Sequence, residues 1–116
     1  RVHIHGVSGQ QQKRGIALNS ASTTIVNSYI SDIRLANGDS QAIAGWNGPG
    51  PYTIVNNFLE ATGENLLLGG SDPAISQLVP SDIVFRGNTV TKRPEWRWQG
   101  YTVKNLIEFK NAQRVT

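Results

Sequence analysis

The sequence predicts an all-β protein with a right-handed parallel β-helix fold (a β-solenoid), in which about four rungs of short strands stack on one another. Three observations predict this fold. Strand-like segments recur at a regular spacing along the chain, and a second set of such segments recurs in step with the first. The gaps between them are rich in Asn, Gly, Ser and Pro and lack helical periodicity, so the repeating unit consists of strands and turns.

The first set of strands occupies three full copies and two partial ones, at positions 24–30, 53–59, 84–90, 2–6 and 113–116. The full copies begin at Thr24, Thr53 and Val84, which gives a nearly constant period. Each copy contains two β-branched or aliphatic stretches separated by a short polar corner. A period of roughly 20 to 30 residues that contains only strands is typical of a β-solenoid.

The second set of strands lies at positions 14–18, 41–45, 65–69 and 105–109. Because successive side chains of a strand point to opposite faces, one residue of each copy should join an internal stack. We expect that stack to contain Ile16, Ile43, Leu67 and Ile107, with Leu18 and Phe109 beside it. The residues expected to face outward are Ala17, Ala44, Leu68 and Glu108.

The polar corners carry Asn27-Ser28, Asn56-Asn57 and Gly87-Asn88. Asn and Gly tolerate the left-handed backbone conformation that so short a corner needs. Stacked Asn side chains can also form hydrogen bonds from rung to rung. We therefore expect an Asn ladder at this corner, and the alignment of the copy at 2–6 places His5 in the same column.

With this corner, the sequence resembles the pectate-lyase-like right-handed β-helix superfamily over nearly its whole length. It also resembles uncharacterised bacterial β-helix repeat proteins in the Lys-Arg-Gly-Ile segment at 13–16 and the Gly-Trp-Asn-Gly-Pro loop at 45–49. The resemblance implies three sheets: the Ile16 and Ile43 strands in the first, the Thr-Ile-Val strands in the second, and the Tyr29 strand in the third. It also implies that a sugar substrate would lie along the first sheet and its flanking loops.

Positions 1–116 are expected to form a single β-helix segment, with no capping helix at either end. The first and last rungs would then expose unpaired backbone edges, which solenoids normally cover. We expect the chain to be a fragment of a longer coil, or its ends to stack on further rungs or on another copy.

Composition excludes several classes of function. The chain has no Cys, which excludes a disulfide scaffold and thiol chemistry, and its longest apolar run, Leu66 to Leu68, is far too short for a membrane span. The basic residues are scattered, with a formal net charge of +3, which does not indicate nucleic-acid binding. Mild basicity fits an acidic polysaccharide slightly better than a neutral one. The resemblance implies an extracellular or cell-envelope location.

Trp46 is the first candidate for substrate binding, because it directly follows a first-sheet strand and an exposed indole face can stack on a pyranose ring. The alternative is that Trp46 folds back over the coil. The predicted substrate-binding set also contains Asn47, which follows Trp46, and Gln41 and Asn65, which lie at the starts of two first-sheet strands.

Trp96 and Trp98 are a second aromatic candidate on either side of Arg97. In an extended segment both indoles would point to one side and form a platform for a sugar. The alternative is that they pack a long loop against the coil.

Lys13, Arg14 and Glu64 are the candidates for catalysis. A β-elimination lyase needs a base, often Arg or Lys, and a group that neutralises the uronate carboxylate. We expect Lys13, Ser40, Glu64 and Lys104 to share one column, so that Glu64 lies between Ser40 and Lys104. A solvated ion pair is the alternative for that column.

No cofactor is predicted. Lyases of the superfamily usually hold calcium between several aspartates, and the carboxylates of this sequence do not form such a cluster. A hydrolase would need paired aspartates, which are also lacking, so a lyase is favoured over a hydrolase. His3 and His5 point to one side of their strand, but a third metal ligand is not evident, so no metal site is predicted.

The resulting expectation is a segment of an extracellular, carbohydrate-active β-helix protein that binds acidic polysaccharide along its first sheet and is lyase-like if it cleaves. The alternative is a non-catalytic structural or adhesive β-solenoid that binds glycan or stacks with itself.

Overall fold

The computed structural model describes residues 1–116 as twelve strands in three parallel sheets, which confirms the predicted fold class. The first sheet has the order β11-β8-β5-β2, with strands Ile107–Phe109, Glu64–Leu68, Gln41–Gly45 and Arg14–Ala17. The second has the order β12-β9-β6-β3, with strands Gln113–Val115, Ser81–Arg86, Gly50–Val55 and Ala21–Val26. The third has the order β1-β4-β7-β10, with strands His3–His5, Tyr29–Ile33, Phe58–Ala61 and Thr89–Thr91.

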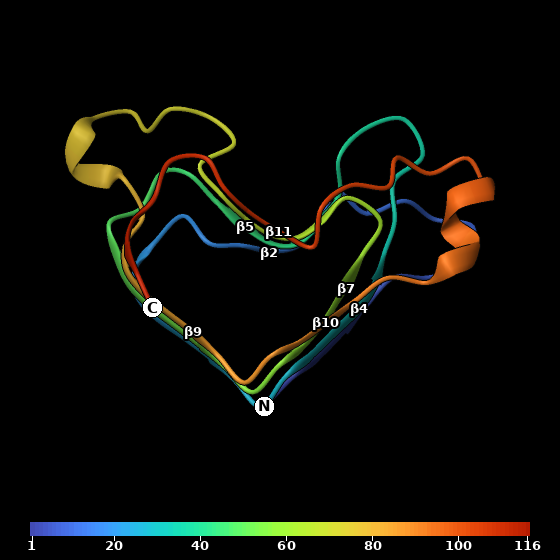
Figure 1. Ribbon diagram of the computed structural model, residues 1–116, viewed down its shortest axis with the longest axis horizontal. Coiled ribbons are helices and arrows are strands. Elements are labelled where there is room, and N and C mark those ends of the chain that lie inside the picture. Colours follow the sequence, from blue (N-terminus) through green and yellow to red (C-terminus); the bar gives the residue numbers. More distant parts are fainter.

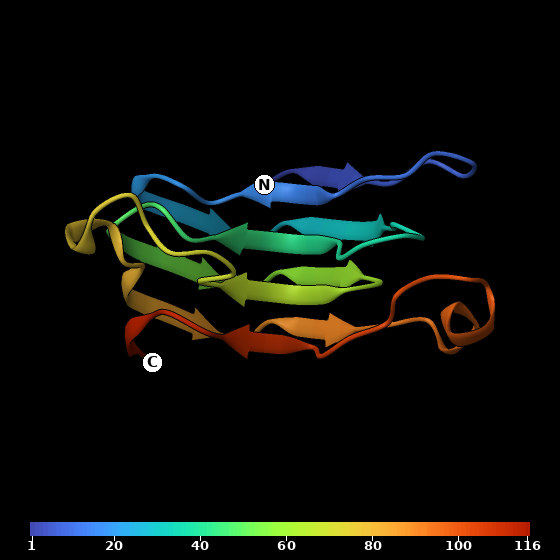
Figure 2. The same cartoon turned by 90° about the horizontal axis from the view of Figure 1, so that it is seen from above.

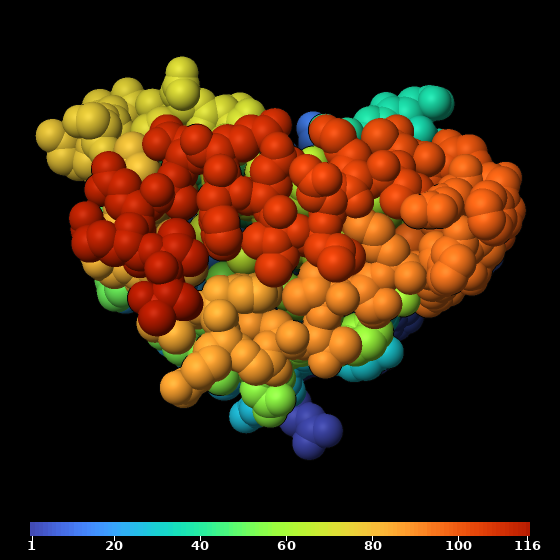
Figure 3. Space-filling model, in the orientation of Figure 1, coloured from blue at the N-terminus to red at the C-terminus, as the bar shows by residue number.

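Each turn of the coil contributes one strand to each sheet, and Figure 2 shows four such rungs stacked in parallel. In Figure 1 the chain runs up the third sheet, across the first and down the second, which is counter-clockwise in that view. The C-terminal rung lies nearest to the reader, as the red and orange atoms of Figure 3 show. A coil that turns counter-clockwise as it approaches the viewer is right-handed, the usual sense for parallel crossovers.

The loops between the third and first sheets, and between the first and second, differ in length from rung to rung. Two of them contain 3-10 helices, η1 (Ser76–Leu78) and η2 (Pro94–Trp98). No helix has the length and apolar character needed to cross a membrane.

The core is a column of aliphatic side chains inside the coil, and one predicted member of it is wrong. Ile16, Ile43 and Ile107 share a register position, but their partner from β8 is Leu66 and not Leu67. Leu67 pairs with Ala44 on the outward side, where Leu68 was expected. The strand begins at Glu64, one position earlier than the sequence alignment assumed, and a slip of one position exchanges the two faces of a strand.

Strict alternation also fails at the start of the first sheet. Ala42 and Ile43 both lie in the core, so the chain bends between them, and Gln41 points outward. Leu18 is buried in the core, as expected. Phe109 pairs with Leu68 in the last rung and is exposed.

The first rung also differs from the prediction. Strand β1 pairs with β4 in the third sheet, with His3 opposite Tyr29 and His5 opposite Ser31. His5 is therefore outside the ladder column, because the copy at 2–6 was aligned with the second-sheet strand that begins at Thr24 and not with the third-sheet strand that begins at Tyr29. Val2 occupies the ladder position of this rung and donates its backbone N–H to Ser28 Oγ (3.2 Å).

The predicted Asn ladder is confirmed at the corner between the second and third sheets. Asn57 is 3% exposed, and its Oδ1 accepts the backbone N–H of Ser28 (2.9 Å). Its Nδ2 donates to the Ile25 carbonyl (2.8 Å) and to Asn88 Oδ1 (3.1 Å). Asn88 repeats the pattern with the backbone N–H of Asn57 (2.9 Å). The ladder therefore satisfies buried polar groups in each rung and fixes the register between rungs.

The residue before each ladder position adopts the left-handed conformation that the corner requires. The φ angles are +52° at Asn27, +55° at Asn56 and +63° at Gly87. Asn56 Nδ2 also donates to Asn27 Oδ1 (2.7 Å) on the exposed side of the corner.

Replacing Asn57 with Ala should lower the free energy of unfolding by about 1–3 kcal/mol, because the buried Ser28 N–H would lose its acceptor and the hydrogen bonds of Asn57 to the Ile25 carbonyl and to Asn88 would be lost. Asn27→Gly is the matched control, since Gly tolerates φ +52° and the hydrogen bond it removes is exposed. Urea denaturation measures both variants. Equal losses for the two would contradict a stabilising role of the inner ladder.

Candidate functional site

A groove of about 460 Å³ lies over the outer face of the first sheet, where the sequence predicted a substrate site. Arg14, Gln41, Ala44 and Leu67 form its floor, and Lys13, Asp39 and Trp46 line its sides. Figure 1 shows why this face is concave: the loops at 34–40 and 69–80 rise on either side of the sheet. The structure thus brings four of the predicted site residues together, namely Lys13, Arg14, Gln41 and Trp46.

Arg14 and Gln41 are register partners at the starts of β2 and β5, and Gln41 is in turn the partner of Glu64 in β8. Gln41 is 2% exposed and donates through Nε2 to Glu64 Oε2 (2.9 Å). Its Oε1 has no hydrogen-bond partner. The groove floor therefore contains an amide that is oriented by a buried carboxylate.

Glu64 was expected between Ser40 and Lys104, and only half of that expectation is correct. Lys104 Nζ lies 3.3 Å from Glu64 Oε1. Ser40 belongs to a different contact, since its Oγ lies 2.7 Å from Thr62 Oγ1. The register, shifted by one position, places Gln41 beside Glu64 instead of Ser40.

Glu64 is fully buried and does not line the groove. Burial acts to raise the pKa of its carboxyl, but the hydrogen bonds from Gln41 and the backbone and the charge of Lys104 outweigh burial, so the pKa is lowered. Glu64 is therefore a carboxylate at neutral pH. In this position it anchors Gln41 and Lys104, and a ligand in the groove would meet those residues first.

Lys104 connects Glu64 to the side of the groove. Its Nζ lies 2.7 Å from Asp39 Oδ2 as well as 3.3 Å from Glu64. The hydrogen bond to Asp39 is the main cause of a raised pKa of Lys104, and the charge of Glu64 adds to it. Lys104 thus shares one positive charge between two carboxylates, and Lys13 and Arg14 are the cations that line the groove beside Asp39.

Trp46 is held at the edge of the groove by its backbone. Asn19 Oδ1 accepts the N–H groups of Trp46 (2.9 Å) and Asn47 (3.2 Å). The guanidinium carbon of Arg14 lies 4.6 Å from the centre of the Trp46 ring, within the range of a cation–π interaction. One cation and one aromatic ring thus contact each other in the lining of the groove.

Asn47 and Asn65, the other residues of the predicted set, point elsewhere. Asn47 Oδ1 accepts the backbone N–H of Ala74 (2.8 Å) and so fastens the 69–80 loop. Asn65 is buried inside the coil, where its Nδ2 donates to the carbonyls of Leu59 (2.7 Å) and Thr91 (2.6 Å). Neither side chain lines the groove.

The expectation that Trp96 and Trp98 point to one side is wrong. Their segment forms the 3-10 helix η2 and not an extended strand, so the two indoles diverge. Trp96 is 1% exposed and packs against the loop, with the Arg93 guanidinium 5.4 Å from its ring centre. Trp98 is 75% exposed and does not share a surface with Trp96.

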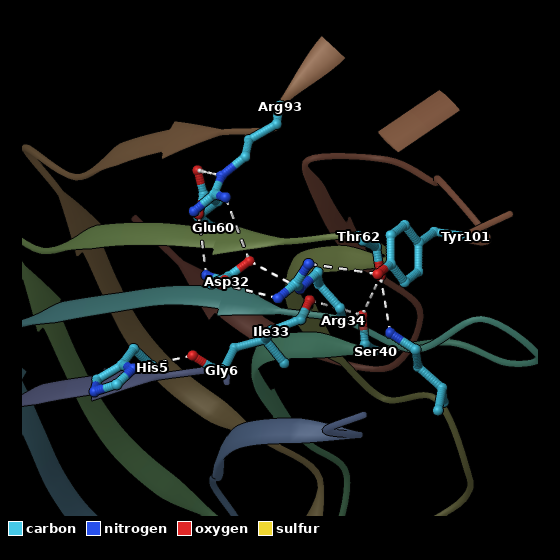
Figure 4. A network of polar contacts seen from close by, with 11 residues as sticks. His5, Gly6, Asp32, Ile33, Arg34, Ser40, Glu60, Thr62, Arg93 and Tyr101 are labelled. Atoms are coloured by element: carbon cyan, nitrogen blue, oxygen red, sulfur yellow. Dashed lines mark hydrogen bonds and ion pairs between the residues drawn. The ribbon is translucent and has the colours of Figure 1, made fainter. Parts of the chain in front are cut away.

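A second polar cluster lies on the third sheet (Figure 4). Arg93 lies 3.1 Å from Glu60 Oε1 and 3.6 Å from Asp32 Oδ1. Arg34 Nε lies 2.9 Å from the same oxygen of Asp32, and its Nη1 donates to the Tyr101 hydroxyl (3.4 Å). Two carboxylates are therefore matched by two guanidinium groups across adjacent rungs.

No group of three or more His, Cys, Asp or Glu side chains is placed to hold a metal ion.

Sequence reasoning missed Lys92, which follows β10 and resembles an ordinary surface lysine. Its Nζ donates to the carbonyls of Ala61 (2.9 Å), Thr62 (3.3 Å) and Gly63, and to Asn65 Oδ1 (2.8 Å). Burial lowers the pKa of Lys92 to about 8, against the opposing charge of Glu64. Lys92 thus binds the tight turn between β7 and β8.

Fold and site together define a parallel β-solenoid with a basic and aromatic groove over one sheet. Comparison of the chain with protein-family models, with curated proteins and with solved structures finds no match. The groove residues themselves are therefore the basis for a functional proposal.

Lys92 should make stability depend on pH. Its folded pKa of about 8 lies below the ordinary lysine value of 10.5, so between those values the unfolded chain binds more protons than the folded chain. Stability should therefore rise with pH across this window, by roughly 1–2 kcal/mol after allowance for screening.

Urea denaturation of the wild type and of Lys92→Met at several pH values in this window measures the effect. Tyrosines titrate in the same window in both proteins, so the difference between the two proteins isolates the contribution of Lys92. The rise should be confined to the wild type. A parallel pH dependence in both proteins would show that Lys92 is not the group responsible.

Proposed function

We propose that this β-solenoid binds an acidic polysaccharide in the groove over its first sheet, as a segment of an extracellular or cell-envelope protein. The observation that carries the proposal is the convergence of Lys13, Arg14, Gln41 and Trp46 on one concave surface. Two cations can pair with a carboxylate, and the indole can contact an apolar sugar face. Gln41 lies in the floor of the groove, where Glu64 orients its amide.

The resemblance to the pectate-lyase-like superfamily supports the same surface, since substrates of that superfamily lie along the corresponding sheet. The rungs are about 4.8 Å apart, so a ligand that follows the coil axis meets a new side chain at each rung. Arg14 and Gln41 are such neighbours. A uronic-acid polymer has the charge, the hydroxyl groups and the extended form that this arrangement suits.

Cleavage is a further step of the proposal. In β-elimination, one of Arg14 and Lys13 would first lose its own proton and then act as the base, while the other stays cationic and pairs with the uronate carboxylate. The base would remove the proton from the carbon next to the carboxylate. The bond from that carbon to the next carbon would become double as the bond to the leaving sugar oxygen breaks, and water would protonate that oxygen. Glu64 would act on the substrate only after Lys104 or Gln41 had moved, because both lie against its carboxylate. Binding is therefore tested before turnover.

The test compares an oligogalacturonide with its fully methyl-esterified form by isothermal titration calorimetry. The proposal predicts tighter binding of the charged ligand and a loss of roughly tenfold in affinity for Arg14→Gln, which corresponds to one charge-assisted contact. Arg86→Gln is the control, because Arg86 is an exposed cation on the second sheet. Equal affinity for both ligands, or equal effects of the two substitutions, would refute an anion-binding groove.

A second candidate function is self-stacking, and the last rung favours it. Strands β10, β11 and β12 lie at the edges of their sheets, and apolar side chains of this rung are exposed, among them Leu106, Ile107, Phe109 and Val115. A second copy that paired with these strands would cover both features. The ladder would be interrupted at such a junction. Val2 of the second copy would occupy the next ladder position, and its side chain could not accept a hydrogen bond from the backbone N–H of Asn88.

Self-stacking predicts that the mass measured by sedimentation rises with protein concentration and that Phe109→Lys abolishes the rise. Ile75→Lys is the matched control, because Ile75 is exposed in the 69–80 loop and away from the last rung. A monomer at all concentrations, or equal effects of both substitutions, would count against this function.

A further inference from the structure

A pair of histidines on the outer face of the third sheet has no part in the groove. His3 and His5 are both exposed in β1, with Ile4 between them facing the core. Their ring centres lie 4.8 Å apart with the ring planes tilted by 37°. Alternate side chains of a strand point to the same side, so this proximity follows from the strand itself.

The His5 ring is fixed in a state that suits metal coordination. Its Nδ1 lies 2.9 Å from the Gly6 carbonyl oxygen, which can only accept a hydrogen bond, so the neutral ring carries its proton on Nδ1. Nε2 then keeps its lone pair. A backbone carbonyl that receives the second ring N–H is a usual partner of a metal-binding histidine.

The backbone that presents this carbonyl is tightly held. The Gly6 N–H donates to the Ser31 carbonyl (3.0 Å), and a Cβ added at Gly6 would lie 1.8 Å from the Asp32 carbonyl oxygen. The His3 ring is restrained on its other side by Tyr29, whose ring lies edge-on with centres 5.2 Å apart. Both imidazoles are thus positioned before any ligand arrives.

We propose that His3 and His5 chelate one borderline divalent transition-metal ion, with Cu²⁺ bound most tightly and water completing its coordination. Imidazole nitrogen suits Cu²⁺, Ni²⁺ and Zn²⁺, and affinities of nitrogen sites reach their maximum at Cu²⁺. The hard cations Ca²⁺ and Mg²⁺ prefer oxygen ligands, which this pair does not offer. The site is separate from the groove and does not depend on the proposed function.

The experiment titrates Cu²⁺, with Ca²⁺ as the negative control, into the chain and into His3→Gln and His5→Gln. All three proteins carry a short extension before Arg1, because a free amino group near His3 could bind Cu²⁺ by itself. Far-ultraviolet circular dichroism checks that each variant keeps its strand content. Calorimetry gives the stoichiometry, and electron paramagnetic resonance reports the number of imidazole nitrogens.

The proposal predicts one Cu²⁺ per chain with two coordinated imidazoles, and a loss of roughly tenfold or more in affinity in each single variant, since each removes one ligand of a chelate. Two independent ions per chain, affinities in the variants equal to that of the wild type, or no binding above the level of Ca²⁺ would each overturn it.

Discussion

Parallel pairing between successive rungs is the constraint on which the rest of this structure depends. It brings segments that are one full repeat apart in the sequence into adjacent strands, about 4.8 Å from one another. Hydrogen bonds between rungs do not choose a register by themselves. The Asn ladder does, because the side chains of the buried Asn57 and the half-buried Asn88 each bind the preceding rung, and a slip would leave those polar groups unpaired.

The groove is a consequence of the same constraint. Outward side chains at equal positions of successive rungs form columns, and the column that starts the first-sheet strands contains Arg14, Gln41 and Glu64. The loops add further side chains beside the column, because their lengths can vary without disturbing the pairing of the strands. Trp46 and Lys104 come from such loops and complete the chemistry around the column. The result is a groove with the buried carboxylate of Glu64 beneath it and the cations Lys13 and Arg14 in its lining.

Much of the fold could be predicted because its signals are local. The corner residues determine their own conformation, and the aliphatic alternation of each copy identifies a strand without knowledge of its neighbours.

The errors arose where register depends on contacts between distant segments. The exchange of Leu66 and Leu67 is a register error of one position, which is enough to exchange the two faces of a strand. His5 was misplaced because the copy at 2–6 was aligned with the second-sheet strand at 24–30, whereas β1 pairs with β4 in the third sheet. The site was predictable in part for the same reason, because Lys13, Arg14, Gln41 and Trp46 adjoin first-sheet strands and their convergence followed from the repeat. Asn65 was misplaced by the same slip of one position, because Glu64 and not Asn65 pairs with Gln41. Lys92 was missed because its acceptors come from the turn between β7 and β8 and from Asn65. No local pattern distinguishes such a lysine from a solvated one.

The central claim is that the first-sheet groove recognises an acidic glycan, and a map of amide and indole chemical shifts on addition of an oligogalacturonide tests it most directly. We expect the perturbed signals to cluster on Lys13, Arg14, Gln41 and the Trp46 indole, while the exposed Trp98 indole stays unchanged. Perturbations centred on Trp98 or on the third sheet, or none at all, would contradict the claim.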